Sequence, residues 1–144
     1  MTFRPDSRYG VSKMFGEALG NLYADKYGFD VLSIRIGNVN DKPLDARRLA
    51  IWISPRDLAQ LVRIGLDTPD LGHQVVYGVS GNTRSWYDNA NATRLGYVPR
   101  DNAEDYAAEI LAVHPEDTGD ALADTHQGGG FVTAENVELP ARPG

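Results

Sequence analysis

Residues 7–39 read SRYGVSKMFGEALGNLYADKYGFDVLSIRIGNV, and this stretch decides the fold. From Ser7 to Tyr27 the apolar residues recur at intervals of three and four, the pattern of an amphipathic helix, and Gly28 supplies a stop signal. The segment from Phe29 to Val39 is short, apolar and rich in β-branched residues, which is typical of a buried strand. A helix followed by a buried strand predicts an α/β fold.

The next residues continue this alternation of helices and strands. We expect a helix capped by Ser54 and ending near Leu66, a strand from His73 to Val79, a short helix from Asp88 to Leu95, and a last helix near 102–112 that begins with a capping box of Asp101 and Glu104. Residues 47–53 fit either a strand or a helix. Beyond residue 112 the composition becomes polar, so we divide the chain into a folded part, 1–112, and a flexible tail, 113–144.

Composition excludes several classes of function. The chain has no cysteine, and its three histidines, His73, His114 and His126, are scattered, so no metal site is expected. The net charge of −6 argues against nucleic-acid binding. No apolar stretch approaches the roughly 20 residues that span a bilayer, and no signal peptide is recognisable, so we expect a cytoplasmic protein. Of the 20 acidic residues 14 are aspartate, and lysine is scarce, which suits either a halophilic source or an ordinary acidic protein.

The chemically informative pair is Tyr9 and Lys13. Residues four apart lie on the same face of a helix, so the Lys13 ammonium can approach the Tyr9 phenol. A free phenol, with a pKa near 10, is a poor base at neutral pH, and a nearby positive charge favours the phenolate. Such a phenol can exchange a proton with a substrate hydroxyl. The spacing alone also fits an exposed helix pair without a role.

A family resemblance gives this pair its context. The run Arg8-Tyr9-Gly10-Val11-Ser12-Lys13-Met14-Phe15-Gly16-Glu17, followed by Ser33-Ile34-Arg35-Ile36-Gly37-Asn38-Val39, resembles the catalytic helix and following strand of extended short-chain dehydrogenases, the epimerase and dehydratase group. Within that group the chain looks most like the uronate dehydrogenases. Four further segments carry this likeness: residues 47–52, 54–57, 85–89, and 95–97 with 101–104.

The resemblance implies an NAD-dependent oxidation of a hexuronate at C1 to the aldarolactone. Tyr9 would be the general base, and Lys13 would hydrogen-bond the nicotinamide ribose. Val39 would face the nicotinamide with a backbone group. Arg47 falls where the family places an arginine on the sugar carboxylate, which suits a planar guanidinium, although an exposed loop arginine is an equal alternative. Asn38 stands where the family has a substrate-contacting serine, which leaves the identity of the sugar open.

The same resemblance suggests three more candidates for the sugar pocket. Ser80, Ser85 and Trp86 follow the second expected strand, although a tryptophan in this place is more often part of the core.

The family's cofactor-binding half has no counterpart in these residues. The tight glycine cluster Gly128-Gly129-Gly130 follows no strand and opens no helix, so it fails the test for a dinucleotide-binding turn. We therefore expect the carboxyl-terminal part of a Rossmann-like, doubly wound parallel sheet with its small substrate-binding region, and without the amino-terminal βαβ half. Three interpretations remain: a catalytic half that needs a Rossmann half, a non-catalytic dimerising module, and a nucleotide-sugar epimerase or dehydratase. NAD and NADP are not distinguished.

Overall fold

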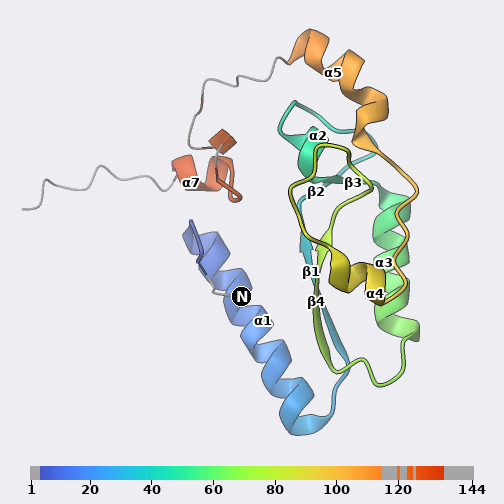
Figure 1. Cartoon of the computed structure of the whole chain (residues 1–144). Coiled ribbons are helices and arrows are strands. Elements are labelled where there is room, and N and C mark those ends of the chain that lie inside the picture. Colours follow the sequence, from blue (N-terminus) through green and yellow to red (C-terminus); the bar gives the residue numbers. More distant parts are fainter. Residues whose placement is uncertain (1–3, 115–119, 121–122, 125, 135–144) are drawn as a thin grey trace, which may run out of the picture. The chain divides into compact units, whose positions relative to one another are not determined.

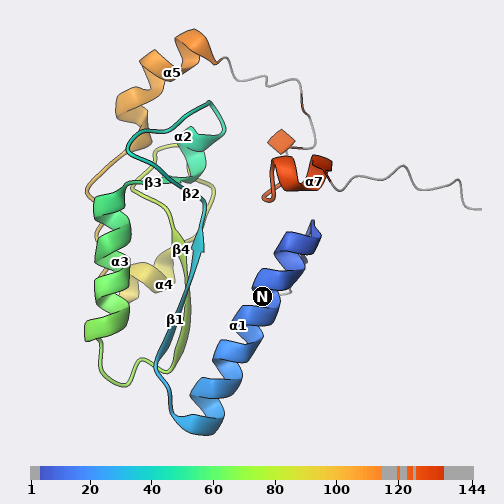
Figure 2. The same ribbon diagram turned by 180° about the vertical axis from the view of Figure 1, so that it is seen from behind.

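The computed structural model describes residues 4–114, 120, 123–124 and 126–134. These residues divide into two compact units, one within Met1–Ala18 and Asp117–Gly144, and the other within Leu19–Glu116. Helix α1 (Arg8–Tyr27) contributes to both units. Figures 1 and 2 show the elements from opposite sides.

The sheet of the larger unit is parallel. Strand β1 (Val31–Ile36) pairs with β4 (His73–Gly78), in a register that runs from Val31 opposite His73 to Ile36 opposite Gly78. A second parallel pair joins β2 (Asn38–Val39) to β3 (Trp52–Ile53). The predicted α/β fold with parallel strands is confirmed.

Helix α3 (Pro55–Asp67) begins where its capping sequence predicts. The Ser54 hydroxyl accepts a hydrogen bond of 3.1 Å from the Asp57 backbone N–H, and Pro55 occupies the first helical position. The apolar face of this helix packs on the sheet in a cluster made of Ile53, Leu61, Val76, Ala92 and Tyr97, with Leu32, Ile34, Leu58, Ile64 and Leu95 at its edge. This cluster fixes α3 against the two long strands.

A second cluster holds the last helical segment. Leu49 and Trp52 pack with Ala103, Ala107 and Ile110. It joins α2 (Arg48–Ile51) and β3 to a 3₁₀ turn, Ala103–Tyr106, and to helix α5 (Ala107–Val113). The short helix α4 (Ala90–Arg94) lies between β4 and this segment in sequence.

Two predictions need correction or refinement. Residues 47–53 are both a short helix and a strand, because α2 runs directly into β3. The capping box is wrong in its first residue: Asn102, and not Asp101, accepts the hydrogen bond from the Glu104 backbone N–H, at 3.0 Å. Asp101 is unavailable for that cap because its carboxylate binds Ser54 and Arg56.

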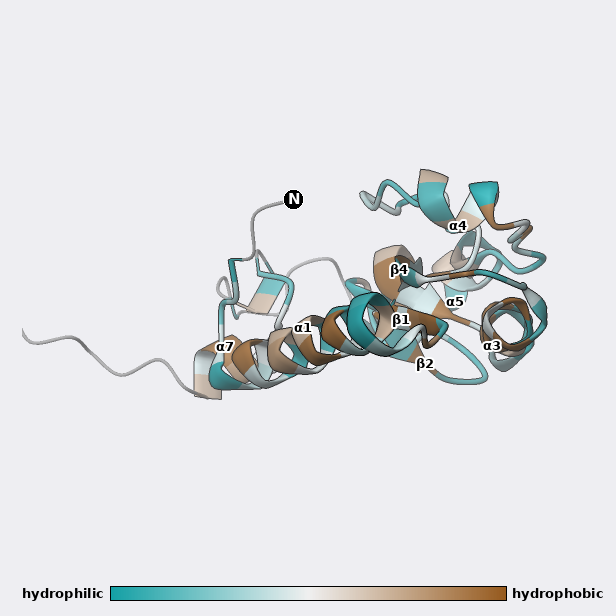
Figure 3. Cartoon of the chain, turned by 90° about the horizontal axis from the view of Figure 1, so that it is seen from below, coloured by the Kyte–Doolittle hydropathy of each residue, from teal (hydrophilic) through white to brown (hydrophobic). Residues whose placement is uncertain are grey.

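Helix α1 does not bury its apolar residues. No side chain of α1 is buried, and 70% of the Phe15 side chain and 55% of the Val11 side chain are exposed. Figure 3 shows brown, hydrophobic bands that alternate with pale and teal ones along this helix. The helix comes close to strand β1 at Gly20, where a Cβ would lie 3.0 Å from the Val31 side chain. Among the described helices, none combines the length and hydropathy needed to cross a bilayer.

Candidate functional site

Tyr9 and Lys13 lie together at the start of α1. The Lys13 Nζ is 4.8 Å from the centroid of the Tyr9 ring, and both side chains are accessible. Ser7 positions this end of the helix: its buried hydroxyl accepts a hydrogen bond of 3.0 Å from the Gly10 backbone N–H. The predicted juxtaposition of ammonium and phenol is therefore present in the smaller unit.

The candidate sugar-binding segments of the larger unit meet around Trp52. Asn38 is the register partner of Trp52 between β2 and β3, and the Ser80 backbone N–H donates to the Trp52 carbonyl at 2.9 Å. Helix α2 begins directly after Arg47 and runs into Trp52. Three predicted residues that are far apart in sequence, Asn38, Arg47 and Ser80, thus flank one short strand at the carboxyl ends of β1 and β4.

A buried carboxyl group, which sequence reasoning missed, holds this region together. Asp57 is fully buried and accepts three hydrogen bonds: from the Ser80 hydroxyl at 2.7 Å, from the Arg100 backbone N–H at 2.9 Å and from the Asp101 backbone N–H at 3.2 Å. It therefore connects α3 with the segments that follow β4 and α4. In the sequence Asp57 looks like an ordinary acid in the first turn of a helix, and no signal marks it as a core residue.

The Ser80 hydroxyl both accepts and donates a hydrogen bond within this network. The oxygen accepts from the Ser54 backbone N–H at 3.1 Å while the hydroxyl proton is donated to Asp57. Ser80 is 4% exposed. Its predicted contact with substrate stays a prediction, and the structure gives the side chain a role inside the core.

Asp101 closes the network at the surface. The Ser54 hydroxyl donates to its carboxylate at 2.5 Å, and Arg56 forms an ion pair with it. The hydrogen bond from Ser54, followed by the contacts with Arg56, lowers the pKa of Asp101 below its usual value of 3.8. Nearby, burial raises the pKa of the Tyr97 phenol above its ordinary range, and the negative charges of Asp57 and Asp101 add to this effect. Tyr97 donates its proton to the Val79 carbonyl and is a structural group.

The remaining predicted residues lie on accessible segments. Trp86 is 57% exposed, so the core role considered for it is wrong, and its ring lies 5.5 Å from that of Tyr87. Ser85 is half-buried, with its hydroxyl accepting from the Tyr87 backbone N–H at 3.4 Å. Val39 is 41% exposed at the end of β2. Arg47 is half-buried.

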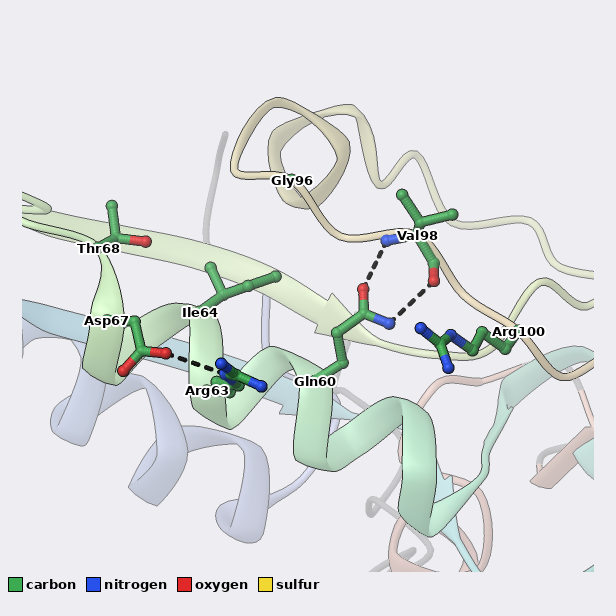
Figure 4. Close-up of a pocket in the computed structure, with 8 residues that line it drawn as sticks. All are labelled: Gln60, Arg63, Ile64, Asp67, Thr68, Gly96, Val98 and Arg100. Atoms are coloured by element: carbon green, nitrogen blue, oxygen red, sulfur yellow. Dashed lines mark hydrogen bonds and ion pairs between the residues drawn. The ribbon is translucent and has the colours of Figure 1, made fainter.

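A shallow pocket of about 450 Å³ lies between α3 and the segment after α4 (Figure 4). The Gln60 side chain bridges both backbone groups of Val98, at 2.9 and 2.7 Å, and Arg63 pairs with Asp67. None of the residues predicted to bind sugar or NAD lines this pocket. Within the part of the chain that the structure describes, no group of three acidic or histidine side chains is arranged to hold a metal ion.

Comparisons with known proteins connect this geometry to a family. No protein-family model matches the chain. The chain is 45% identical over 131 residues to the uronate dehydrogenase of Pseudomonas putida, covering 91% of this chain and 48% of that protein. A crystal structure of glucuronic acid dehydrogenase from Chromohalobacter salexigens matches with a TM-score of 0.84 at 46% identity, over 90% of this chain and 49% of that one.

A third comparison concerns the cofactor. A mutant uronate dehydrogenase from Agrobacterium tumefaciens, solved in complex with NAD, matches with a TM-score of 0.85 at 40% identity, over 92% of this chain and 50% of that one. The chain thus spans about half the length of the relatives it matches. By sequence and by structure, the chain is a homologue of the carboxyl-terminal part of proteins named uronate dehydrogenase.

Proposed function

We propose that this chain provides the catalytic helix and the sugar-acid-binding part of an NAD-dependent dehydrogenase that oxidises a hexuronate at C1 to the aldarolactone. The observation that carries the proposal is the pairing of Tyr9 with Lys13, 4.8 Å from ammonium to ring centroid, in a homologue of the uronate dehydrogenases. Relatives of this name act on the same class of substrate.

In this reaction Tyr9 takes the proton from the anomeric hydroxyl of the sugar. The C1–H bond breaks as a hydride leaves, and the carbon–oxygen bond of C1 becomes the lactone carbonyl. NAD supplies the hydride acceptor when it is bound. Lys13 has two roles in this proposal: its ammonium lies beside the Tyr9 ring, 4.8 Å from the ring centroid, and it would donate a hydrogen bond to the ribose of the cofactor when NAD is bound.

Substrate recognition is assigned to the segments around Trp52. Arg47 is the residue for the sugar carboxylate, because a guanidinium can bind a carboxylate through two parallel hydrogen bonds. Asn38 and the exposed Trp86 supply further contacts with the sugar. A uronate is preferred to the nucleotide sugars of epimerases because a uronate carries at the sugar ring the carboxylate that a guanidinium binds through two hydrogen bonds.

Among the described residues, those proposed to hold NAD suit its nicotinamide end. Lys13 and the backbone of Val39 suit the ribose and the nicotinamide, and Val39 is accessible. Among the described residues Gly128-Gly129-Gly130 follows helical residues 123–124 and no strand, so the cluster does not match the family's glycine-rich turn for the pyrophosphate. We therefore assign the pyrophosphate and adenosine contacts to a polypeptide part outside this sequence.

The exposed apolar side of α1 favours a second candidate, a non-catalytic fragment that dimerises or binds a partner. Val11, Phe15 and Leu22 are 55%, 70% and 50% exposed, and contiguous apolar surface of this kind marks interaction sites. The same surface is required under the first proposal, since a Rossmann half would have to cover part of this chain. The two candidates differ in whether Tyr9 performs chemistry.

The deciding experiment measures NAD binding by calorimetry and NADH formation with galacturonate, on the purified chain in high salt. The variants are Tyr9→Phe and, as matched control, Tyr27→Phe at the other end of the same helix, where the ring is 57% exposed. NADH formation that Tyr9→Phe abolishes and Tyr27→Phe preserves supports the dehydrogenase. A folded chain that binds neither NAD nor galacturonate and self-associates in the ultracentrifuge supports the interaction module instead.

A further inference from the structure

A segment near the carboxyl terminus contacts the ring of Tyr9. Phe131, in the short helix α7 (Gly130–Ala134), stacks on the Tyr9 ring with centroids 4.6 Å apart and an angle of 7° between the planes. Both residues belong to the smaller unit, in which the start of α1 and α7 are drawn close together in Figure 1. A stretch that its composition predicts to be a polar tail therefore supplies an aromatic partner to the candidate catalytic base.

A second contact, independent of the stack, joins the same two segments. The Gly128 backbone N–H donates to the Asp6 carboxylate at 2.8 Å, three residues before Tyr9 in the sequence. A Cβ on Gly128 would lie 2.7 Å from the Asp6 carboxylate and 2.9 Å from the Val132 side chain, so a larger residue here would have to displace these side chains. The two contacts flank the first turn of α1.

The glycine cluster now has a structural explanation. Gly129 has a φ of 55°, in the left-handed region that favours glycine, and the chain turns tightly there. The Phe131 backbone N–H donates to the Gly128 carbonyl at 3.2 Å, and the Val132 N–H to the Gly129 carbonyl at 2.9 Å. The turn thus places the Phe131 ring three residues after the anchored Gly128. The cluster is a turn that presents an aromatic ring and not a phosphate-binding loop.

We propose that Phe131 is a positioning residue for Tyr9, held in place by the Asp6–Gly128 hydrogen bond. The proposal rests on Tyr9 being the general base, as proposed above. Tyr9 is 47% exposed, and its own helix offers the ring only the flexible Lys13 side chain as a neighbour in the contacts described above. Stacking of two aromatic rings favours one relative orientation and limits rotation of both side chains. A base held in one rotamer accepts a proton from the substrate more efficiently than a base that samples several rotamers.

The first test concerns the contact itself and needs no catalysis. Aromatic NMR spectra of the chain, with the Tyr9 resonances assigned through Tyr9→Phe, report the ring current of Phe131. Phe131→Leu and Gly128→Ala should both remove the upfield displacement of the Tyr9 ring protons. Gly130→Ala is the matched control, because a Cβ there meets nothing within 4 Å, and it should leave the Tyr9 resonances in place.

The second test concerns catalysis, on the form of the protein that produces NADH. Phe131→Leu should lower kcat about tenfold, in line with the cost of misplacing a catalytic group, while KM for the uronate stays within about twofold. Phe131→Tyr, which keeps the stack, should restore kcat. An unchanged or raised kcat in Phe131→Leu overturns the proposal, since a raised kcat would mean that the segment obstructs the site.

The two arms separate this inference from the proposed function. A Phe131-dependent shift of Tyr9 without any dehydrogenase activity would keep the positioning contact and contradict the proposed function. Dehydrogenase activity in a chain whose Tyr9 resonances do not respond to Phe131→Leu or Gly128→Ala would keep the function and refute the positioning role.

Discussion

Replacing Asp57 with asparagine tests whether a buried carboxyl group organises the site. The carboxyl group accepts hydrogen bonds from Ser80, from the Arg100 N–H and from the Asp101 N–H, at 2.7, 2.9 and 3.2 Å. An amide keeps one acceptor oxygen for Arg100, but its NH₂ group would face two donors. Hydrogen bonds to a charged group contribute about 1.5–3 kcal/mol each, and a buried donor left without a partner costs about 1–3 kcal/mol. We therefore expect Asp57→Asn to lower the free energy of unfolding by about 3 kcal/mol.

Urea denaturation followed by circular dichroism measures this loss, and a thermal scan should show a decrease in Tm of about 10 °C for a chain of this size. The matched control is Asp67→Asn, which lies in the same helix with 63% of its side chain exposed and pairs with Arg63. That exposed pair contributes about 0.5 kcal/mol at most. If the free energies of unfolding of Asp57→Asn and Asp67→Asn differ by less than about 0.5 kcal/mol, the network does not stabilise the fold as described.

Two further predictions follow from local geometry. Ser54→Ala removes the cap of helix α3 and should lower the free energy of unfolding by about 1 kcal/mol. The hydrogen bond from Ser54 is the largest cause of the lowered pKa of Asp101 in the folded state. Because the folded-state pKa lies below the unfolded value, ionised Asp101 stabilises the fold above the unfolded pKa, and this stabilisation is lost as pH falls through the folded pKa. Ser54→Ala should therefore make the free energy of unfolding less dependent on pH in the acid range. Urea midpoints as a function of pH check this, and parallel curves for both proteins would contradict it. Gly37→Ala should prevent normal folding, because its Cβ would lie 2.1 Å from the Ile51 carbonyl oxygen. In the control Gly16→Ala the Cβ meets nothing within 4 Å, so this variant should be neutral or stabilised by up to about 1 kcal/mol. Equal Tm values for the two variants would refute the prediction for Gly37.

Local signals account for the elements that were predicted well. The Ser54 cap with proline after it marks the start of α3, and the β-branched run around Ile34 marks β1, because each signal acts within a few residues. The pairing of Tyr9 with Lys13 follows from helical spacing alone. The comparisons confirm the resemblance to the uronate dehydrogenases.

Tertiary contacts account for what the sequence could not show. Asp101 was expected to cap a helix, but Ser54 and Arg56, more than forty residues away, engage its carboxylate, so Asn102 caps instead. Asp57 is buried for a comparable reason, since its donors come from distant segments. The roles assigned to Asn38, Arg47 and Trp86 stay predictions, because they concern contacts with a substrate.

The hydrogen bond from the Ser80 hydroxyl to Asp57 has a consequence for redesigning the sugar preference that we propose for this chain. Ser80 belongs to the buried hydrogen-bond network around Asp57, and changing it would disturb the anchoring of α3 as well as any sugar contact. Ser85 and Trp86 lie a few residues further on, and the exposed ring of Trp86 can be exchanged without opening the core. A library that varies Ser85 and Trp86 while retaining Ser80 should therefore yield mostly folded proteins, from which altered specificity can be selected.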